Sequence, residues 1–257
     1  MCELFGLSSR SVYTANGYLR TFFDRSSLHP HGWGLACVSQ TGVVIRKEGR
    51  KASGSPCLKK LLSQPIRSRI LLGHIRYATI GHVAYENAHP FTARDVVGRQ
   101  WTLIHNGTIF DYAPLNGYLP KQRGDTDSER ILLYLIDKLN EAQVKKGAGL
   151  TFEERFALLD GILVDMSQGN KLNLLFSDGK YLYVHTNCQG TLYTLCRGGT
   201  RLFATVPLDE EVWQPVPFTR LLAYDAGKLV KTGTDHRHEY FENEESMRFL
   251  YQIFAGL

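Results

Sequence analysis

Short apolar runs separated by tight-turn sequences recur along this chain, and this pattern restricts the fold more than any other feature. Three turn sequences join neighbouring runs: Gln40-Thr41-Gly42, Ser177-Asp178-Gly179-Lys180 and Asp225-Ala226-Gly227. Connections this short join antiparallel strands, because parallel strands need a long crossover. We therefore predict an α+β fold with many antiparallel strands and few helices, rather than a regular alternation of strand and helix.

The apolar periodicity predicts strands and helices in the following places. Strands are expected at 2–7, 32–38, 43–47, 69–75, 101–105, 172–176, 181–185, 191–195, 202–205, 220–224 and 229–232. Helices are expected at 16–25, 56–63, 126–141, 152–166 and 244–254. The clearest is 126–141, because its leucines and isoleucines fall on one stripe and Thr126 or Asp127 can cap it. Residues 76–102 are expected to be irregular.

The composition excludes several classes of protein. Hydrophobic residues make up 43% and charged residues 21% of the 257 residues, which suits a packed core and excludes a disordered chain. We expect a single domain over residues 1–257. The net charge of +5 is spread out, so no nucleic-acid partner is expected. With no apolar run near the ~20 residues of a membrane span and no signal peptide, the expected location is cytoplasmic, without membrane contact.

The cysteines raise the first chemical question. The five cysteines form no C-x-x-C pair and are expected to be free thiols. Cys2 follows Met1, and its side chain is small enough for Met1 to be removed, which would leave Cys2 as the first residue. A terminal cysteine carries a thiol beside an α-amine whose reference pKa is about 7.7–8, so nucleophile and base come from one residue. The alternative is an arbitrary cysteine at position 2.

Two charged segments suggest a site for an amino-acid head group. Arg76 directly follows the predicted strand 69–75, and a guanidinium fixed at a strand end suits bidentate capture of a carboxylate. The segment Asp125-Thr126-Asp127-Ser128-Glu129 opens the clearest helix, so one acid can cap the helix while another binds an ammonium group. A surface ion pair and helix capping alone are the respective alternatives.

A third segment, His105-Asn106-Gly107, follows the predicted strand 101–105. The asparagine offers a side-chain N–H donor, and the glycine lets a backbone N–H approach a ligand without obstruction by a Cβ atom. These are the parts of an oxyanion hole. An ordinary Asn-Gly turn between strands is the alternative.

Taken in order, these segments resemble the class II glutamine amidotransferases, which belong to the N-terminal-nucleophile (Ntn) hydrolases. The resemblance is carried by Met1-Cys2-Glu3-Leu4-Phe5-Gly6, by residues 73–79 followed by Glu86-Asn87-Ala88-His89-Pro90-Phe91, by His105-Asn106-Gly107 and by the segment 125–129. It covers the first half of the chain closely. The resemblance implies a four-layer αββα sandwich of two stacked, mostly antiparallel sheets.

The resemblance also implies roles for the reacting groups. Cys2 attacks the side-chain amide of glutamine with its own α-amine as base, while Asn106 and the backbone of Gly107 hold the oxyanion. The attack gives a thioester and releases ammonia or an amine, and water then returns glutamate. Such a set would make the chain an amidohydrolase that acts on glutamine or a γ-glutamyl amide.

The implied head-group contacts come from a second set of residues. Arg76 grips the α-carboxylate, assisted by the region of Thr79 and Ile80, and Asp127 pairs with the α-ammonium. His89 either shapes the loop around this pocket or contacts the substrate. Many family members have a histidine where this chain has Ile80, so a side-chain role at that position is not carried over.

Two alternative functions are open, and neither a metal nor a cofactor is expected. The chain resembles the short, stand-alone family members, but it is alternatively a glutaminase subunit that delivers ammonia to a synthetase partner, or a non-catalytic amino-acid-binding domain. A homo-oligomer is compatible with its apolar aromatic residues. The pairs in His29-Pro30-His31 and His236-Arg237-His238 have i, i+2 spacing without nearby cysteines, so no metal is expected, and no cofactor is implied.

Overall fold

The computed structural model describes residues 2–39, 41–78 and 81–242 of the chain. Within these residues the strands are β1 (Glu3–Thr14), β2 (Trp33–Ser39), β3 (Gly42–Glu48), β4 (Arg67–Ile75), β5 (Phe91–Arg94), β6 (Gln100–Thr108), β7 (Lys171–Ser177), β8 (Leu182–Thr186), β9 (Tyr193–Arg197), β10 (Thr200–Ala204), β11 (Gln214–Pro215), β12 (Arg220–Asp225) and β13 (Lys228–Thr232). The α-helices are α1 (Asn16–Asp24), α2 (Pro56–Leu62), α3 (Asp127–Lys146) and α4 (Phe152–Met166). Short 3₁₀ turns lie at Arg25–Leu28, Ala52–Gly54 and Ala113–Tyr118.

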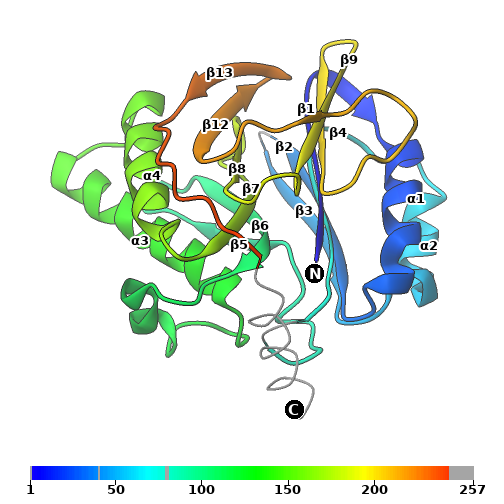
Figure 1. Cartoon of the computed structure of the whole chain (residues 1–257), viewed down its shortest axis with the longest axis horizontal. Helices are drawn as coiled ribbons and strands as arrows, with labels where there is room; N and C mark the ends of the chain where they lie inside the picture. Colours follow the sequence, from blue (N-terminus) through cyan, green and yellow to red (C-terminus); the bar gives the residue numbers. More distant parts are fainter. Residues whose placement is uncertain (1, 40, 79–80, 243–257) are drawn as a thin grey trace.

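Two antiparallel sheets lie face to face between two helical layers (Figure 1). One sheet has the order β11-β9-β10-β1-β4-β2-β3, and the other has the order β13-β12-β8-β7-β6-β5. Helices α1 and α2 cover the outer side of the first sheet, and α3 and α4 cover the outer side of the second (Figure 1). The predicted α+β class and four-layer αββα sandwich are confirmed.

The two long helices begin where their sequences supply a cap. The Thr126 hydroxyl accepts a hydrogen bond from the Glu129 backbone N–H at 3.3 Å, so Thr126, rather than Asp127, caps α3. Thr151 and Glu154 cap α4 reciprocally. Helix α3 ends at Gly147, whose φ of 71° lies in the left-handed region that glycine adopts without strain.

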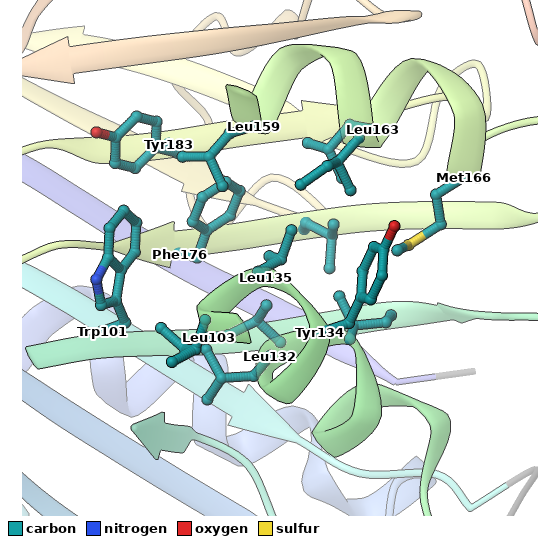
Figure 2. Close-up of a cluster of buried hydrophobic side chains, with 14 of the residues drawn as sticks. Trp101, Leu103, Leu132, Tyr134, Leu135, Leu159, Leu163, Met166, Phe176 and Tyr183 are labelled. Atoms are coloured by element: carbon teal, nitrogen blue, oxygen red, sulfur yellow. The ribbon is translucent and has the colours of Figure 1, made fainter. Parts of the chain in front are cut away.

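The core is divided into three clusters because side chains alternate across each strand. Leu4, Leu72, Ile104 and Leu175 belong to the cluster between the two sheets. A second cluster lies between α1, α2 and the first sheet. The third fills the space between the other sheet and helices α3 and α4, and Figure 2 shows part of it, including Trp101, Leu103, Leu135, Leu159, Phe176 and Tyr183.

Most predicted elements are present, but three boundaries in the first half differ. The region predicted to be irregular contains β5, which pairs with β6 at the sheet edge. Strand β6 continues to Thr108, so Asn106 and Gly107 lie within the strand and not after it. Strand β1 continues to Thr14, past the predicted end at residue 7, with a register shift between Ser8 and Tyr13 in its pairing with β4. The predicted helix 244–254 lies outside the described residues.

Two further expectations can be compared with the structure. All five cysteines are free thiols, as predicted. Among the described residues, no helix combines the length and the apolar character that a membrane span requires.

Candidate active site

Three separate strands bring the predicted reactive residues to one end of the space between the sheets. Leu4 and Ile104 face the inner cluster. Residues two positions apart on a strand share a face, so Cys2 points inward like Leu4, and Asn106 points inward like Ile104. His74, near the end of β4, follows inward-facing Leu72 in the same way and lies 3.2 Å from the His105 carbonyl oxygen through its Nε2 atom. The two sheets therefore meet directly at this end.

The Cys2 thiol is held by the backbone that follows β4. Its Sγ atom lies 3.3 Å from the Tyr77 carbonyl oxygen and accepts a hydrogen bond from the Tyr77 N–H at 3.4 Å. Burial raises the pKa of the Cys2 thiol, while the backbone hydrogen bond to Tyr77 and the positive charge of Arg76 lower it. The raised pKa keeps the resting thiol protonated at neutral pH, so nucleophilic attack requires a base.

The neighbouring residue anchors the start of β1 from the opposite face. The Glu3 carboxylate accepts two hydrogen bonds from Arg25, at 2.6 and 2.8 Å, and lies 3.8 Å from His29 Nε2. Such a bidentate pair fixes orientation as well as position. Sequence reasoning assigned no role to Glu3 or Arg25, because acid and base lie 22 residues apart and only the packing of α1 against the sheet brings them together.

Arg76 is buried, with 2% of its surface exposed. Its guanidinium donates to the carbonyl oxygens of His82, at 2.8 Å, and Gly81, at 3.0 Å. The guanidinium thus orders the loop that follows β4. Two predicted contact residues in this loop, Thr79 and Ile80, lie outside the described residues.

A second set of contacts closes the same loop against the start of α3. The Asn87 side-chain amide donates to the His82 carbonyl oxygen at 2.9 Å and to the Asp125 carboxylate. In return, the Asp125 backbone N–H donates to the Asn87 side-chain oxygen at 2.9 Å. Asp125, the first acid of the segment 125–129, therefore braces a loop.

Asp127 occupies the first turn of α3 and is buried, with 4% of its surface exposed. One carboxylate oxygen accepts the Ile109 backbone N–H at 2.9 Å. The other lies 3.2 Å from the Ser128 hydroxyl, which also contacts His105 Nδ1 at 3.0 Å. The two acids of the segment thus separate into a loop brace and a buried carboxylate beside the inner end of β6, and the helix is capped by Thr126 rather than by an acid.

Asn106 and Gly107 lie in register with Asn173 and Leu172 of β7. Asn106 is 3% exposed and belongs to the inner face. A Cβ atom on Gly107 would lie 2.0 Å from the Lys171 carbonyl oxygen and 2.4 Å from His105 Nε2, so only glycine fits. The Asn-Gly pair is a strand segment with an inward amide, and the turn alternative is wrong.

His89 stacks on His74 with ring centroids 3.9 Å apart and lies against Phe91 at 4.6 Å. Neither of its ring nitrogens has a hydrogen-bond partner among the described residues. Burial lowers the pKa of His89 well below 6.5, and the neighbouring His74 lowers it further. The ring is therefore neutral and serves here as a packing surface under the site.

Sequence reasoning missed the side-chain roles of two further groups. His31 Nδ1 accepts the Ala78 backbone N–H at 2.8 Å and so braces the segment that holds Cys2. His105 and Ser128 contact each other across 23 residues. The sequence signal for this contact is the alternation of β6, which places His105 on the face toward α3.

The part of the chain that the structure describes contains no group of three or more His, Cys, Asp or Glu side chains suited to a metal ion. In the segment after β13, His236 Nε2 instead lies 3.1 Å from His185 Nε2.

Comparison with known proteins gives this arrangement a family. The profile of the glutamine amidotransferases class-II family matches residues 1–200. The chain therefore belongs to the class II glutamine amidotransferases.

Individual relatives agree with this assignment. YafJ of Escherichia coli, provisionally named a glutamine amidotransferase, is 31% identical over 82% of this chain and 82% of its own length. The crystal structure of a predicted glutamine amidotransferase from Pseudomonas aeruginosa superposes with a TM-score of 0.66 at 23% identity, over 90% of this chain and 100% of that one. The glutamine phosphoribosylpyrophosphate amidotransferase of Bacillus subtilis superposes with a TM-score of 0.63 at 17% identity, over 90% of this chain and 48% of that one. The two structural likenesses concern the fold.

Proposed function

We propose that this chain hydrolyses the side-chain amide of glutamine or of a γ-glutamyl amide through a thioester on Cys2. The observation that carries the proposal is the convergence of Cys2, Arg76 and Asn106 at one end of the space between the sheets. Arg76 and Asp127 bind the α-carboxylate and α-ammonium, with the region of Thr79 and Ile80 assisting. Two fixed charges position the distant amide carbon at the thiol, which turns binding energy into orientation.

The proposed reaction proceeds in two balanced steps. The Cys2 sulfur bonds to the amide carbon, and its proton passes through the base to the departing nitrogen, so that the carbon–nitrogen bond breaks and ammonia or an amine leaves. Water then attacks the thioester, which releases glutamate and returns the proton to the thiol. In both steps Asn106 and the Gly107 backbone N–H stabilise the negative oxygen of the tetrahedral intermediate.

The base in this scheme is the α-amine of Cys2 after removal of Met1. The raised pKa of the buried thiol supports the need for a base. Neutral His89 acts as support beneath the loop rather than as a proton carrier. We also propose that residues 1–257 encode one amidohydrolase domain, from which Met1 is removed, and that this domain works in the cytoplasm.

Intact-mass spectrometry with a glutamine analogue that carries a diazoketone electrophile tests the proposal. The purified protein is expected to lack Met1 and to gain one equivalent of label on Cys2, accompanied by glutamate release from glutamine. Cys2→Ala is expected to lose the label, whereas Cys57→Ala, which alters an exposed cysteine, is expected to keep it. Retention of Met1, or label on another residue, contradicts the proposal and supports a non-catalytic binding domain.

A second candidate function shares the same chemistry. The Bacillus subtilis amidotransferase matches this chain over 48% of its own length, so its remaining chain lies outside the common fold. This observation favours a glutaminase that passes ammonia to a synthetase partner. Turnover of γ-glutamyl amines by the isolated chain supports the hydrolase, and glutaminase activity that rises only on addition of a co-purified synthetase supports the partner.

A further inference from the structure

Asp127, Ser128 and His105 form a buried chain of hydrogen bonds at β6, the strand that also carries Asn106 and Gly107. The Ser128 oxygen lies 3.2 Å from Asp127 Oδ1 and 3.0 Å from His105 Nδ1. All three residues are at most 5% exposed. Because water has little access, the hydrogens available inside this chain decide which contacts are satisfied.

Counting those hydrogens gives a definite result. His105 Nε2 lies 3.2 Å from the Lys171 carbonyl oxygen, which can only accept, so Nε2 carries a hydrogen. In a neutral imidazole Nδ1 is then an acceptor. Asp127 Oδ1 is also an acceptor, and the single Ser128 hydroxyl hydrogen lies between the two. This set of three hydrogen-bonded side chains is therefore one hydrogen short.

The charge of His105 follows from its surroundings. Burial lowers the pKa of His105, although the Asp127 carboxylate and the hydrogen bond to the Lys171 carbonyl raise it and the Lys171 ammonium lowers it again. The other titratable groups whose charge is coupled to this imidazole are the histidines His74, His89 and His185. The balance leaves His105 neutral at pH 7.

We propose that Ser128 is a specificity-determining residue that couples the α-ammonium group of the substrate to His105. An ammonium group bound between Asp127 Oδ1 and the Ser128 oxygen, which lie 3.2 Å apart, donates one hydrogen to each, so the Ser128 hydroxyl hydrogen turns to His105 Nδ1 and every acceptor is satisfied. A ligand without a primary ammonium leaves one buried acceptor unsatisfied. This inference rests on the proposed function and extends it, since it names the group by which the site selects α-amino acids.

The coupling also reaches the reacting end of the site. The His105 ring lies directly against Gly107, where a Cβ atom would be 2.4 Å from its Nε2 atom. A hydrogen bond to Nδ1 fixes this ring. Ser128 thus also positions this ring, but its main effect is on substrate binding, through the hydrogen bond that it accepts from the ammonium group, and its loss should weaken binding far more than it slows the chemical steps.

Binding to the Cys2→Ala protein, measured by calorimetry, tests the inference without turnover. The two ligands are L-glutamine and glutaramic acid, which is glutamine without its α-ammonium group. Adding Ser128→Ala is expected to weaken glutamine binding ~10–100-fold, as expected for a lost hydrogen bond to a charged group, and glutaramic acid binding less than about 3-fold. Ser128→Thr keeps the hydroxyl and is expected to restore glutamine binding to within about 3-fold.

The pH dependence provides a readout that a merely structural role would not change. Protonated His105 supplies the missing hydrogen itself, so glutamine binding should weaken once the pH falls below the lowered pKa of His105, and Ser128→Ala should weaken this dependence. Equal weakening of both ligands by Ser128→Ala, or an unchanged pH profile, overturns the inference alone. Failure of Cys2→Ala to bind glutamine, together with no hydrolysis by the wild type, overturns the proposed function and the inference with it.

Discussion

Two buried aspartates lie at opposite ends of the six-stranded sheet and have very different surroundings. Asp178, which follows β7, accepts hydrogen bonds from Arg155 Nη2 at 2.9 Å, the Tyr183 hydroxyl at 3.2 Å and the backbone N–H groups of Lys180 and Tyr181 at 3.0 and 2.8 Å. Asp127, at the other end, has one backbone donor and a share of one serine hydroxyl.

This difference separates a structural carboxylate from the one that we propose to bind the substrate. The negative charge of Asp178 is fully compensated inside the protein, as stability demands of a buried charge. Around Asp127 the protein supplies fewer donors than the acceptors require. Asp127 therefore keeps hydrogen-bonding capacity that a ligand can use, as the proposed function requires.

The largest expected effect is a loss of stability when the hydrogen-bonded carboxylate of Asp178 is removed. Asp178→Ala leaves the Arg155 guanidinium buried without its partner, so the free energy of unfolding should fall by about 3–5 kcal/mol. Urea denaturation measures this change. The exposed pair Lys121–Asp137 provides the control, because Asp137→Ala should cost below about 1 kcal/mol. Equal losses in the two variants would mean that burial does not distinguish the pairs.

In the proposed active site, Asn106→Ala should lower kcat by ~10²–10³, because it removes a donor to the oxyanion. Ammonia release from glutamine measures the rate. Stability should change little, and Asn116→Ala, at an exposed position, should keep wild-type kinetics. Near-normal turnover by Asn106→Ala would refute the oxyanion assignment.

Asp127→Asn tests the comparison between the two acids directly. It should raise KM for glutamine ~10–100-fold through loss of the charge that pairs with the α-ammonium, while kcat stays within about 3-fold. Steady-state kinetics measure both constants. Asp137→Asn, on the helix surface, serves as the matched control. An unchanged KM would remove Asp127 from the head-group site.

The smallest effect concerns pH. Burial lowers the pKa of His74 to about 3, so the unfolded chain binds more protons than the folded one between about pH 3 and 6.5, and stability falls as the pH falls through that range. Between pH 7 and 5 the loss from His74 should be about 2 kcal/mol. Urea denaturation of His74→Gln should show a correspondingly weaker pH dependence, whereas a change at exposed His82 should leave it as in the wild type.

Much of the local structure could be predicted from the sequence. The cap at Thr151, the stripe of α3 and the turn at Gly179 depend on residues only a few positions apart, so local patterns find them. Strand β5 escaped prediction because it is short and its stability comes from pairing with β6, a contact between separate segments. The predicted site residues were named through their motifs, and the proposed roles still await the experiments above.

The amino-acid sequence by itself determined the antiparallel class of the fold and the positions of its long helices, and it named the side chains that we propose to react. Only the tertiary structure decided that Asp125 braces a loop while Asp127 is buried beside His105, and that Glu3 pairs with Arg25. The physical reason is that helix periodicity and turn chemistry act over a few residues, whereas the partner of a buried polar group is chosen by which strands and helices pack together.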